Sequence, residues 1–120
     1  MKTKRFVVVI TKGPVGTEAG SLGLDAALAA AAFDQDVTVL FKDEGLLQLI
    51  QNQESQLLGN ISTLANFGLM KMYGVTRVWA AQSSAESLHL NNTQLAHSPE
   101  LVSDTVIDEA LQSANQVWIY

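Results

Sequence analysis

Four glycines separate the apolar run at residues 6–11 from an alanine-rich segment, an arrangement that often holds a phosphate in α/β proteins. They are Gly13, Gly16, Gly20 and Gly23. The Lys-Ser/Thr pair of a Walker A loop and the Gly-x-Gly-x-x-Gly of a dinucleotide loop are both missing. Glu18 would repel an anion at the start of the helix. The stretch therefore favours a tight strand-to-helix turn capped by Thr17. The alternative is a small flavin or nucleotide site in the loop from Thr11 to Thr17.

Other side chains with catalytic or metal-binding potential do not form a known pattern. His89 and His97 are the only histidines, and their spacing without nearby cysteines does not match a metal site. A triad could be assembled from Ser83 or Ser84 with His89 and Asp104, but the sequence has no Gly-x-Ser-x-Gly elbow. We therefore predict no catalytic, cofactor-binding or metal-binding residue in this chain.

The composition restricts the class of function further. The chain has no cysteine, so it cannot form a disulfide, a thiolate metal site or a persulfide. Its net charge of −5 argues against direct nucleic-acid binding. Only 16% of its residues are charged, against about 25% in average domains, which suggests that other subunits cover part of the surface. Without a membrane span or a signal peptide, we expect a soluble cytoplasmic protein.

The hydrophobic pattern predicts alternating strands and helices in one domain spanning residues 1–120. Apolar runs at residues 5–11, 37–41, 78–81 and 117–120 predict strands, and Leu101 and Val102 form a minimal fifth. Helices are expected at residues 17–33, 61–73 and 104–114, the last capped by Ser103. The Ser83 to Glu86 stretch reads as a capping box. This order predicts a three-layer α/β/α sandwich with a mainly parallel sheet of about five strands.

The helix predicted at residues 17–33 has apolar residues on two faces, so both faces should be covered. One face carries Leu22, Ala26, Ala29 and Phe33. The second carries Leu24, Leu28 and Ala31. Small alanines allow close approach both of the sheet and of another subunit. Met70, Met72 and Tyr73 form a further apolar group, which the pattern assigns either to the core or to an interface.

The opening stretch resembles the DsrE/DsrF-like family, in particular its TusC/DsrF branch, and the similarity extends over nearly all of the chain. The family pattern is Pro-x-Gly-Thr-x-x-Gly-x-x-Gly-Leu-Asp-Ala followed by a helix of small residues. The matching residues are Pro14, Gly16, Thr17, Gly20, Gly23, Leu24, Asp25, Ala26, Leu28 and Ala29. Relatives often have a glutamate where this chain has Leu22. The final "NQVWIY" is similar to the last strand of the family.

The resemblance implies a flavodoxin-like or Rossmann-like sandwich and a heterohexamer with two copies each of TusB-type, TusC-type and TusD-type subunits. In such a complex, a cysteine of the TusD-type subunit holds a persulfide. Sulfur arrives from a TusA-type carrier, leaves on a TusE-type carrier and ends in 2-thiouridine at the wobble position of tRNA. Sulfur-oxidising relatives use the same assembly in dissimilatory metabolism. Contact with tRNA would be indirect, through the complex.

In relatives with the reactive cysteine, that residue lies at or just after the end of the third strand. Here the corresponding region includes Val78, Trp79 and Ser83. Serine cannot hold sulfane sulfur, because the exchange requires a thiolate. The resemblance therefore implies a non-catalytic subunit whose motif residues contribute to an interface. A free-standing homo-oligomer of the same family is the alternative.

Overall fold

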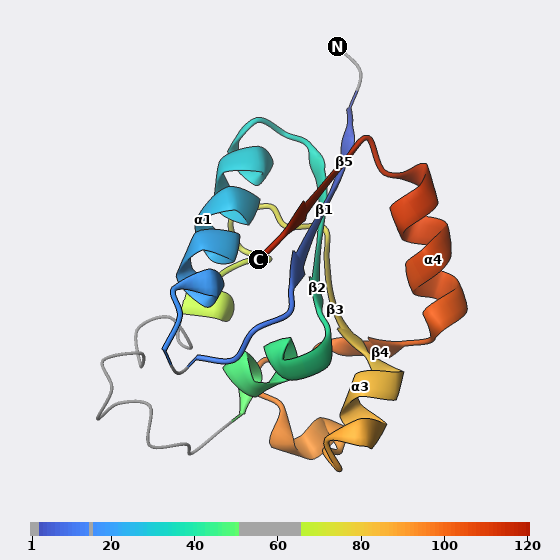
Figure 1. Cartoon of the computed structure of the whole chain (residues 1–120). Coiled ribbons are helices and arrows are strands. Elements are labelled where there is room, and N and C mark those ends of the chain that lie inside the picture. The colour runs from blue at the N-terminus through green and yellow to red at the C-terminus, as the bar shows by residue number, and fades with distance from the viewer. Residues whose placement is uncertain (1–2, 15, 51–65) are drawn as a thin grey trace.

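The computed structural model describes residues 3–14, 16–50 and 66–120. Five parallel strands form one sheet in the order β4-β3-β2-β1-β5 (Figure 1). They are β1 (Arg5–Ile10), β2 (Asp36–Phe41), β3 (Arg77–Ala81), β4 (Glu100–Val102) and β5 (Gln116–Ile119). The predicted parallel sheet is confirmed, including the minimal strand at Leu101 and Val102.

Helices cover both faces of the sheet and complete the predicted three layers. Helix α1 (Ala19–Ala32) lies on one face and α4 (Asp104–Ser113) on the other (Figure 1). The short helices are α3 (Gln82–Ser87) and the 3-10 helices η1 (Asp43–Leu49) and η3 (Asn92–Gln94). No helix in the described ranges is long and apolar enough to cross a membrane.

The β-branched runs of β1 and β2 are buried because helices cover both sides of these central strands. On the α1 side, the core includes Val8, Ile10, Val39 and Phe41, and the Phe41 ring meets that of Phe67 edge-on at 5.1 Å. On the α4 side, a smaller core combines Val7, Val9, Leu40, Ala81, Val102 and Ile107. The alternation of side chains between the two faces therefore divides each run between two cores.

Two predicted helix starts need correction. Helix α1 begins at Ala19, and its N-cap residue is Glu18, which makes no capping hydrogen bond. The Thr17 hydroxyl still accepts a hydrogen bond from the Ala19 amide at 3.0 Å. The capping box predicted from Ser83 to Glu86 is wrong, because α3 follows directly from β3 with Ala81 at its N-cap position. Ser83 therefore lies inside the first turn, where its hydroxyl bonds a residue outside the helix.

The helix predicted at residues 61–73 lies partly outside the described residues. The polar stretch 51–60 and Val15 lie wholly outside them. Asn66 and Phe67 are helical, and residues 68–74 form turns. Gly74 ends this segment with a φ of 104°, as expected for a glycine stop. The cap of α4 is confirmed, since the Ser103 hydroxyl accepts from the Val106 amide at 3.3 Å.

Candidate functional site

The glycine-rich turn brings α1 close to β1 and to η1. A Cβ on Gly23 would lie 2.8 Å from Cγ1 of Ile10, and one on Gly20 would lie 2.6 Å from Oε1 of Gln48. Gln48 is itself buried and donates from Nε2 to the Lys12 carbonyl at 3.0 Å. These two glycines therefore face the protein interior, where they allow close packing, and they do not line a ligand site.

An open hollow of about 840 Å³ lies beside this turn, at the carboxyl end of β1 and β5. Its wall includes Lys12, Glu18, Leu22 and Ile119. The Thr11 hydroxyl, a candidate phosphate ligand, donates instead to the Tyr120 carbonyl at 2.8 Å. One base, one acid and an apolar wall give the hollow no concentration of positive charge for a phosphate.

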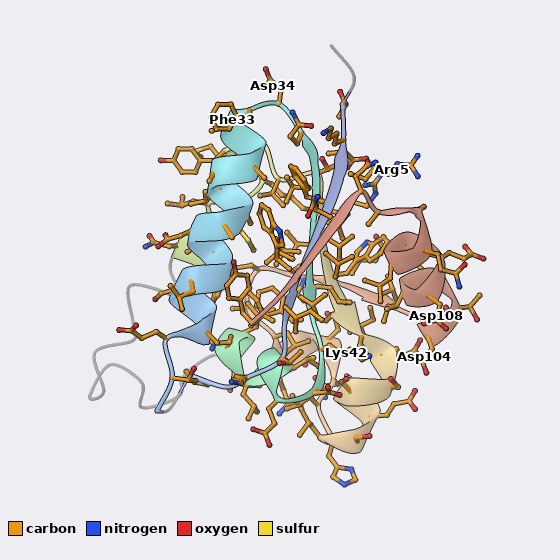
Figure 2. All side chains as sticks on the ribbon, turned by 45° about the horizontal axis from the view of Figure 1, so that its top comes forward. Arg5, Phe33, Asp34, Lys42, Asp104 and Asp108 are labelled. Atoms are coloured by element: carbon orange, nitrogen blue, oxygen red, sulfur yellow. The ribbon has the colours of Figure 1, made fainter. Side chains whose placement is uncertain are left out.

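The two apolar faces of α1 have different surroundings. Leu24, Ala27 and Ala31 are buried against the sheet. On the outer face, Leu22 is 51% and Phe33 75% exposed. Figure 2 shows Phe33 at the far end of α1, next to Asp34. The described residues thus cover one of the two predicted apolar faces and leave the other exposed.

The motif residues of the opening stretch divide in the same way. Buried members are Pro14, Gly20, Gly23 and Leu24. Exposed or half-buried members are Gly16, Thr17, Asp25, Ala26 and Ala29. Gly16 adopts a φ of 76°, a left-handed conformation that favours glycine in the turn. The motif therefore combines a packing role on the inner side of α1 with a free surface on its outer side.

Exposed apolar residues also occur in the segment whose Gly74 lies close to Ala31 of α1. Met72 and Tyr73 are exposed while Met70 is buried, so the structure separates residues that the sequence pattern could not. On α1 itself, Ala29 and Phe33 line a groove of about 510 Å³. The groove also contains the stacked rings of Phe6 and Trp118, with centroids 5.2 Å apart. Exposed apolar residues of this kind are expected where another protein chain binds.

Strand β5 extends the exposed apolar region to the edge of the sheet. Among the described residues it pairs with β1 alone, so its second edge has backbone groups without a strand partner there. Ile119 is 69% exposed, and Val117 is also exposed. Such an edge usually needs cover in a stable protein, which is consistent with contact to another chain.

The structure does not bring the three residues near the end of β3 together into one site. Val78 is buried in the core on the α1 side, and Trp79 packs against the core on the α4 side. Ser83 is exposed at the start of α3 and donates from Oγ to Oδ1 of Asp104 at 3.0 Å. Because this aspartate bonds the serine directly, no histidine lies between the two as a triad requires.

Sequence reasoning missed a second serine contact in the same region. Ser84 is buried, and its Oγ accepts a hydrogen bond from the Asp43 amide at 2.8 Å. Asp43 has a φ of 53°, so this bond supports a left-handed residue at the end of β2. No local signal predicts it, because the two residues are 41 positions apart in the chain. Ser84 thus has a structural role, joining η1 to α3.

Neither histidine takes part in a metal cluster. His89 and His97 are both exposed and both have positive φ values. Within the described part of the chain, no three His, Cys, Asp or Glu side chains gather as they would around a metal ion.

A parallel α/β/α sandwich with an apolar outer helix face defines the structural class, and comparisons with known proteins give the family. The chain belongs to the DsrE/DsrF-like family, whose model matches residues 4–118. It is 31% identical over 118 residues to a TusC homologue of Haemophilus influenzae, covering 97% of this chain and 99% of the relative. A TusC homologue of Aliivibrio fischeri is 27% identical over 116 residues, covering 97% and 98%.

Other matches agree with this assignment. TusC of Escherichia coli is 36% identical over 81 residues, which cover 68% of each chain. Among solved structures, the ychN protein from E. coli has a TM-score of 0.71 at 15% identity, covering 99% of this chain and 100% of that one. A protein of unknown function from Methanobacterium thermoautotrophicum has a TM-score of 0.61 at 17% identity, covering 96% and 98%. These two structures support the fold.

Proposed function

We propose that this chain is a TusC-type, non-catalytic subunit of a sulfur-relay complex that acts in 2-thiouridine formation at the tRNA wobble position. The similarity to TusC proteins over 97% of the chain supports the subunit type. The proposed partners are TusB-type and TusD-type subunits in a 2:2:2 assembly. TusA-type and TusE-type carriers would deliver and remove sulfur, and tRNA would be reached only through the complex, in the cytoplasm.

The observation that carries this proposal is the contrast between a chain without cysteine and a broad exposed apolar surface. Sulfur relay requires a thiolate that accepts and releases sulfane sulfur. Ser83, near the position of the reactive cysteine in relatives, cannot do this. A partner must therefore supply the thiol, and the exposed apolar residues on and near α1 offer a surface for binding other subunits of the complex.

The proposal is tested by mixing the chain with TusB-type and TusD-type homologues and a TusA-type carrier loaded with labelled sulfur. We expect label on the TusD-type subunit and none on this chain. A double substitution, Ala26→Leu with Ala29→Leu, should reduce assembly while the isolated chain stays folded. Gln112→Leu, on the exposed side of α4, is the matched control and should assemble normally.

The hollow beside the glycine-rich turn keeps one alternative testable, a flavin or nucleotide site in the loop from Thr11 to Thr17. A ligand at 100 times its Kd would stabilise the chain by about 2.7 kcal/mol, which a thermal unfolding scan detects. We expect no such shift with FMN or ATP. A clear shift with either compound would favour the ligand site. A stable homo-oligomer that does not bind the homologous subunits would instead favour the free-standing member of the family.

A further inference from the structure

The outer face of α1 has a regular spacing that the assignment as a subunit does not by itself explain. We call Leu22, Ala26, Ala29 and Phe33 the outer seam, and their spacing is four, three and four residues. Alternating steps of three and four keep a row of side chains on one side of a helix. This is the spacing with which two helices pack at about 20° to each other. The seam thus has the pattern of a helix that packs along a second helix.

The seam is also symmetric about its own midpoint, which lies between Ala27 and Leu28. If a second α1 lies antiparallel across a two-fold axis at this point, Leu22 faces Phe33 and Ala26 faces Ala29. Small residues then meet at the centre, where helix axes can approach to about 8 Å. Large residues meet at both ends. A single surface patch that complements itself in this way is what a two-fold contact between identical chains requires.

The ends of α1 offer complementary shapes for the same arrangement. At one end, Phe33 is 75% exposed and stands above the groove that contains Trp118. At the other end, Leu22 borders the open hollow together with Ile119. The two-fold axis brings the exposed Phe33 of each copy to the hollow of the other, so this side chain meets an open space on both sides of the axis.

The charges at the two ends of α1 are compatible with antiparallel pairing. Lys12 and Glu18 border the hollow near Leu22, while Lys4 and Asp34 lie near Phe33. Antiparallel helices place each of these ends against the other, so an acid of one copy can face a base of its partner.

We propose that α1 packs antiparallel against α1 of a second copy of this chain, across a two-fold axis between Ala26 and Ala29. This inference rests on the proposed function in one respect, namely that a 2:2:2 assembly supplies the second copy. Helix α1 has 14 residues and so is about 21 Å long. One such helix pair buries less than the roughly 800 Å² per partner of a standard interface. The contact would therefore join two copies within the larger complex and would be weak in the isolated chain.

Cysteine cross-linking tests the arrangement with a clean background, because the chain has no cysteine of its own. Across the axis, the two copies of position 29 are offset by three residues, about 4.5 Å along the helix. That offset allows the Cα separation of about 4.4–6.8 Å that a disulfide needs. The two copies of position 22 are offset by eleven residues, about 16.5 Å, which is too far.

We therefore expect oxidation of the 2:2:2 complex to link Ala29→Cys chains to each other and to leave Leu22→Cys chains unlinked. Phe33→Cys alone should also stay unlinked, whereas a mixture of Leu22→Cys and Phe33→Cys chains should link to each other. The mass of the linked pair identifies it as two copies of this chain and not a bond to a homologue's thiol.

The outcomes separate this inference from the proposed function. An assembled 2:2:2 complex in which Ala29→Cys does not link would overturn the α1 pairing and leave the subunit role intact. Linking of Leu22→Cys to itself as strongly as Ala29→Cys would also overturn it. If Ala29→Cys links selectively in a chain that does not bind its homologues, the pairing is supported and the proposed heterohexamer is contradicted.

Discussion

The helices on the two faces of the sheet present opposite kinds of surface. Helix α4 has three acids among ten residues, and Figure 2 shows Asp104 and Asp108 pointing away from the sheet. Its one fully buried residue is Ile107. Helix α1 has Asp25 as its one charged residue among fourteen, and its outer face is apolar. The pattern of α4 is typical of a helix in water, while that of α1 indicates a helix between the sheet and another chain.

The difference also extends to how each helix packs on the sheet. Helix α4 is anchored by a large side chain, Ile107, against the smaller of the two cores. Helix α1 has small residues such as Gly23 and Ala27 on its inner side, and at Gly23 its backbone approaches Ile10 of β1 closely. Substitutions at Ile107 and Gly23 should therefore destabilise the fold for opposite reasons. A smaller residue at 107 leaves a cavity, and a larger residue at 23 overfills the contact with β1.

The largest expected effect on stability is at the anchor of α4. Ile107→Ala removes a residue that is 2% exposed, and we expect the free energy of unfolding to fall by about 2–5 kcal/mol. Urea unfolding of the isolated chain measures it. A loss below about 1 kcal/mol would mean that α4 contributes little to the core and would weaken the comparison of the two helices.

The next largest effect is expected on the inner face of α1. Gly23→Ala places a Cβ 2.8 Å from Cγ1 of the buried Ile10, so the helix or this side chain must shift, and we expect a loss of about 1–3 kcal/mol in unfolding free energy. Ala29→Ser, on the outer face, is the control and should change stability by less than about 0.5 kcal/mol. Equal effects at the two positions would contradict the assignment of an inner and an outer face.

A smaller effect is expected at the start of α4. Ser103→Ala removes the hydroxyl that accepts from the Val106 amide, and we expect a loss of about 1 kcal/mol. Glu18, at the same position of α1, makes no capping hydrogen bond, so Glu18→Ala should cost less. Thermal unfolding of the two variants side by side checks the order. A larger loss from Glu18→Ala would reverse this part of the comparison.

The smallest effect on the isolated chain is expected at exposed residues of either helix, and here assembly distinguishes them. Phe33→Ser and Asp108→Ser should each change unfolding free energy by less than about 0.5 kcal/mol. In co-expression with homologous subunits, Phe33→Ser should reduce the yield of complex, and Asp108→Ser should not. If both variants assemble as well as the natural chain, the outer face of α1 is not an interface.

Local sequence patterns predicted the strands and the double face of α1 because the relevant signals lie within one element. The β-branched run of β1 needs both faces covered, and the apolar spacing of α1 predicts two covered faces in the same way. Patterns failed at Ser83 and Ser84, whose hydroxyls bond Asp104 and Asp43. Those partners are brought close only by the order of the strands, which local patterns do not contain.

Two other features show what local sequence patterns can and cannot predict. Met70 is buried while Met72 and Tyr73 are exposed, a distinction that depends on how residues 66–74 lie beside α1. The capping box at Asn91 was within reach of sequence reasoning, since Asn91 and Gln94 have the required spacing. The Asn91 amide donates to Oε1 of Gln94 at 3.0 Å, and the Asn91 side chain accepts from the Thr93 amide. However, only a weak apolar run follows this capping box, and the same residue spacing is common in loops. The exposed surface of α1 was predictable as a pattern, while the identity of its partner was not.

Native mass spectrometry of this chain, alone and co-expressed with TusB-type and TusD-type homologues, tests the central claim most directly. The account predicts a 2:2:2 complex in which the only persulfide-bearing thiol belongs to the TusD-type subunit. A stable homo-oligomer that does not bind those homologues would contradict it.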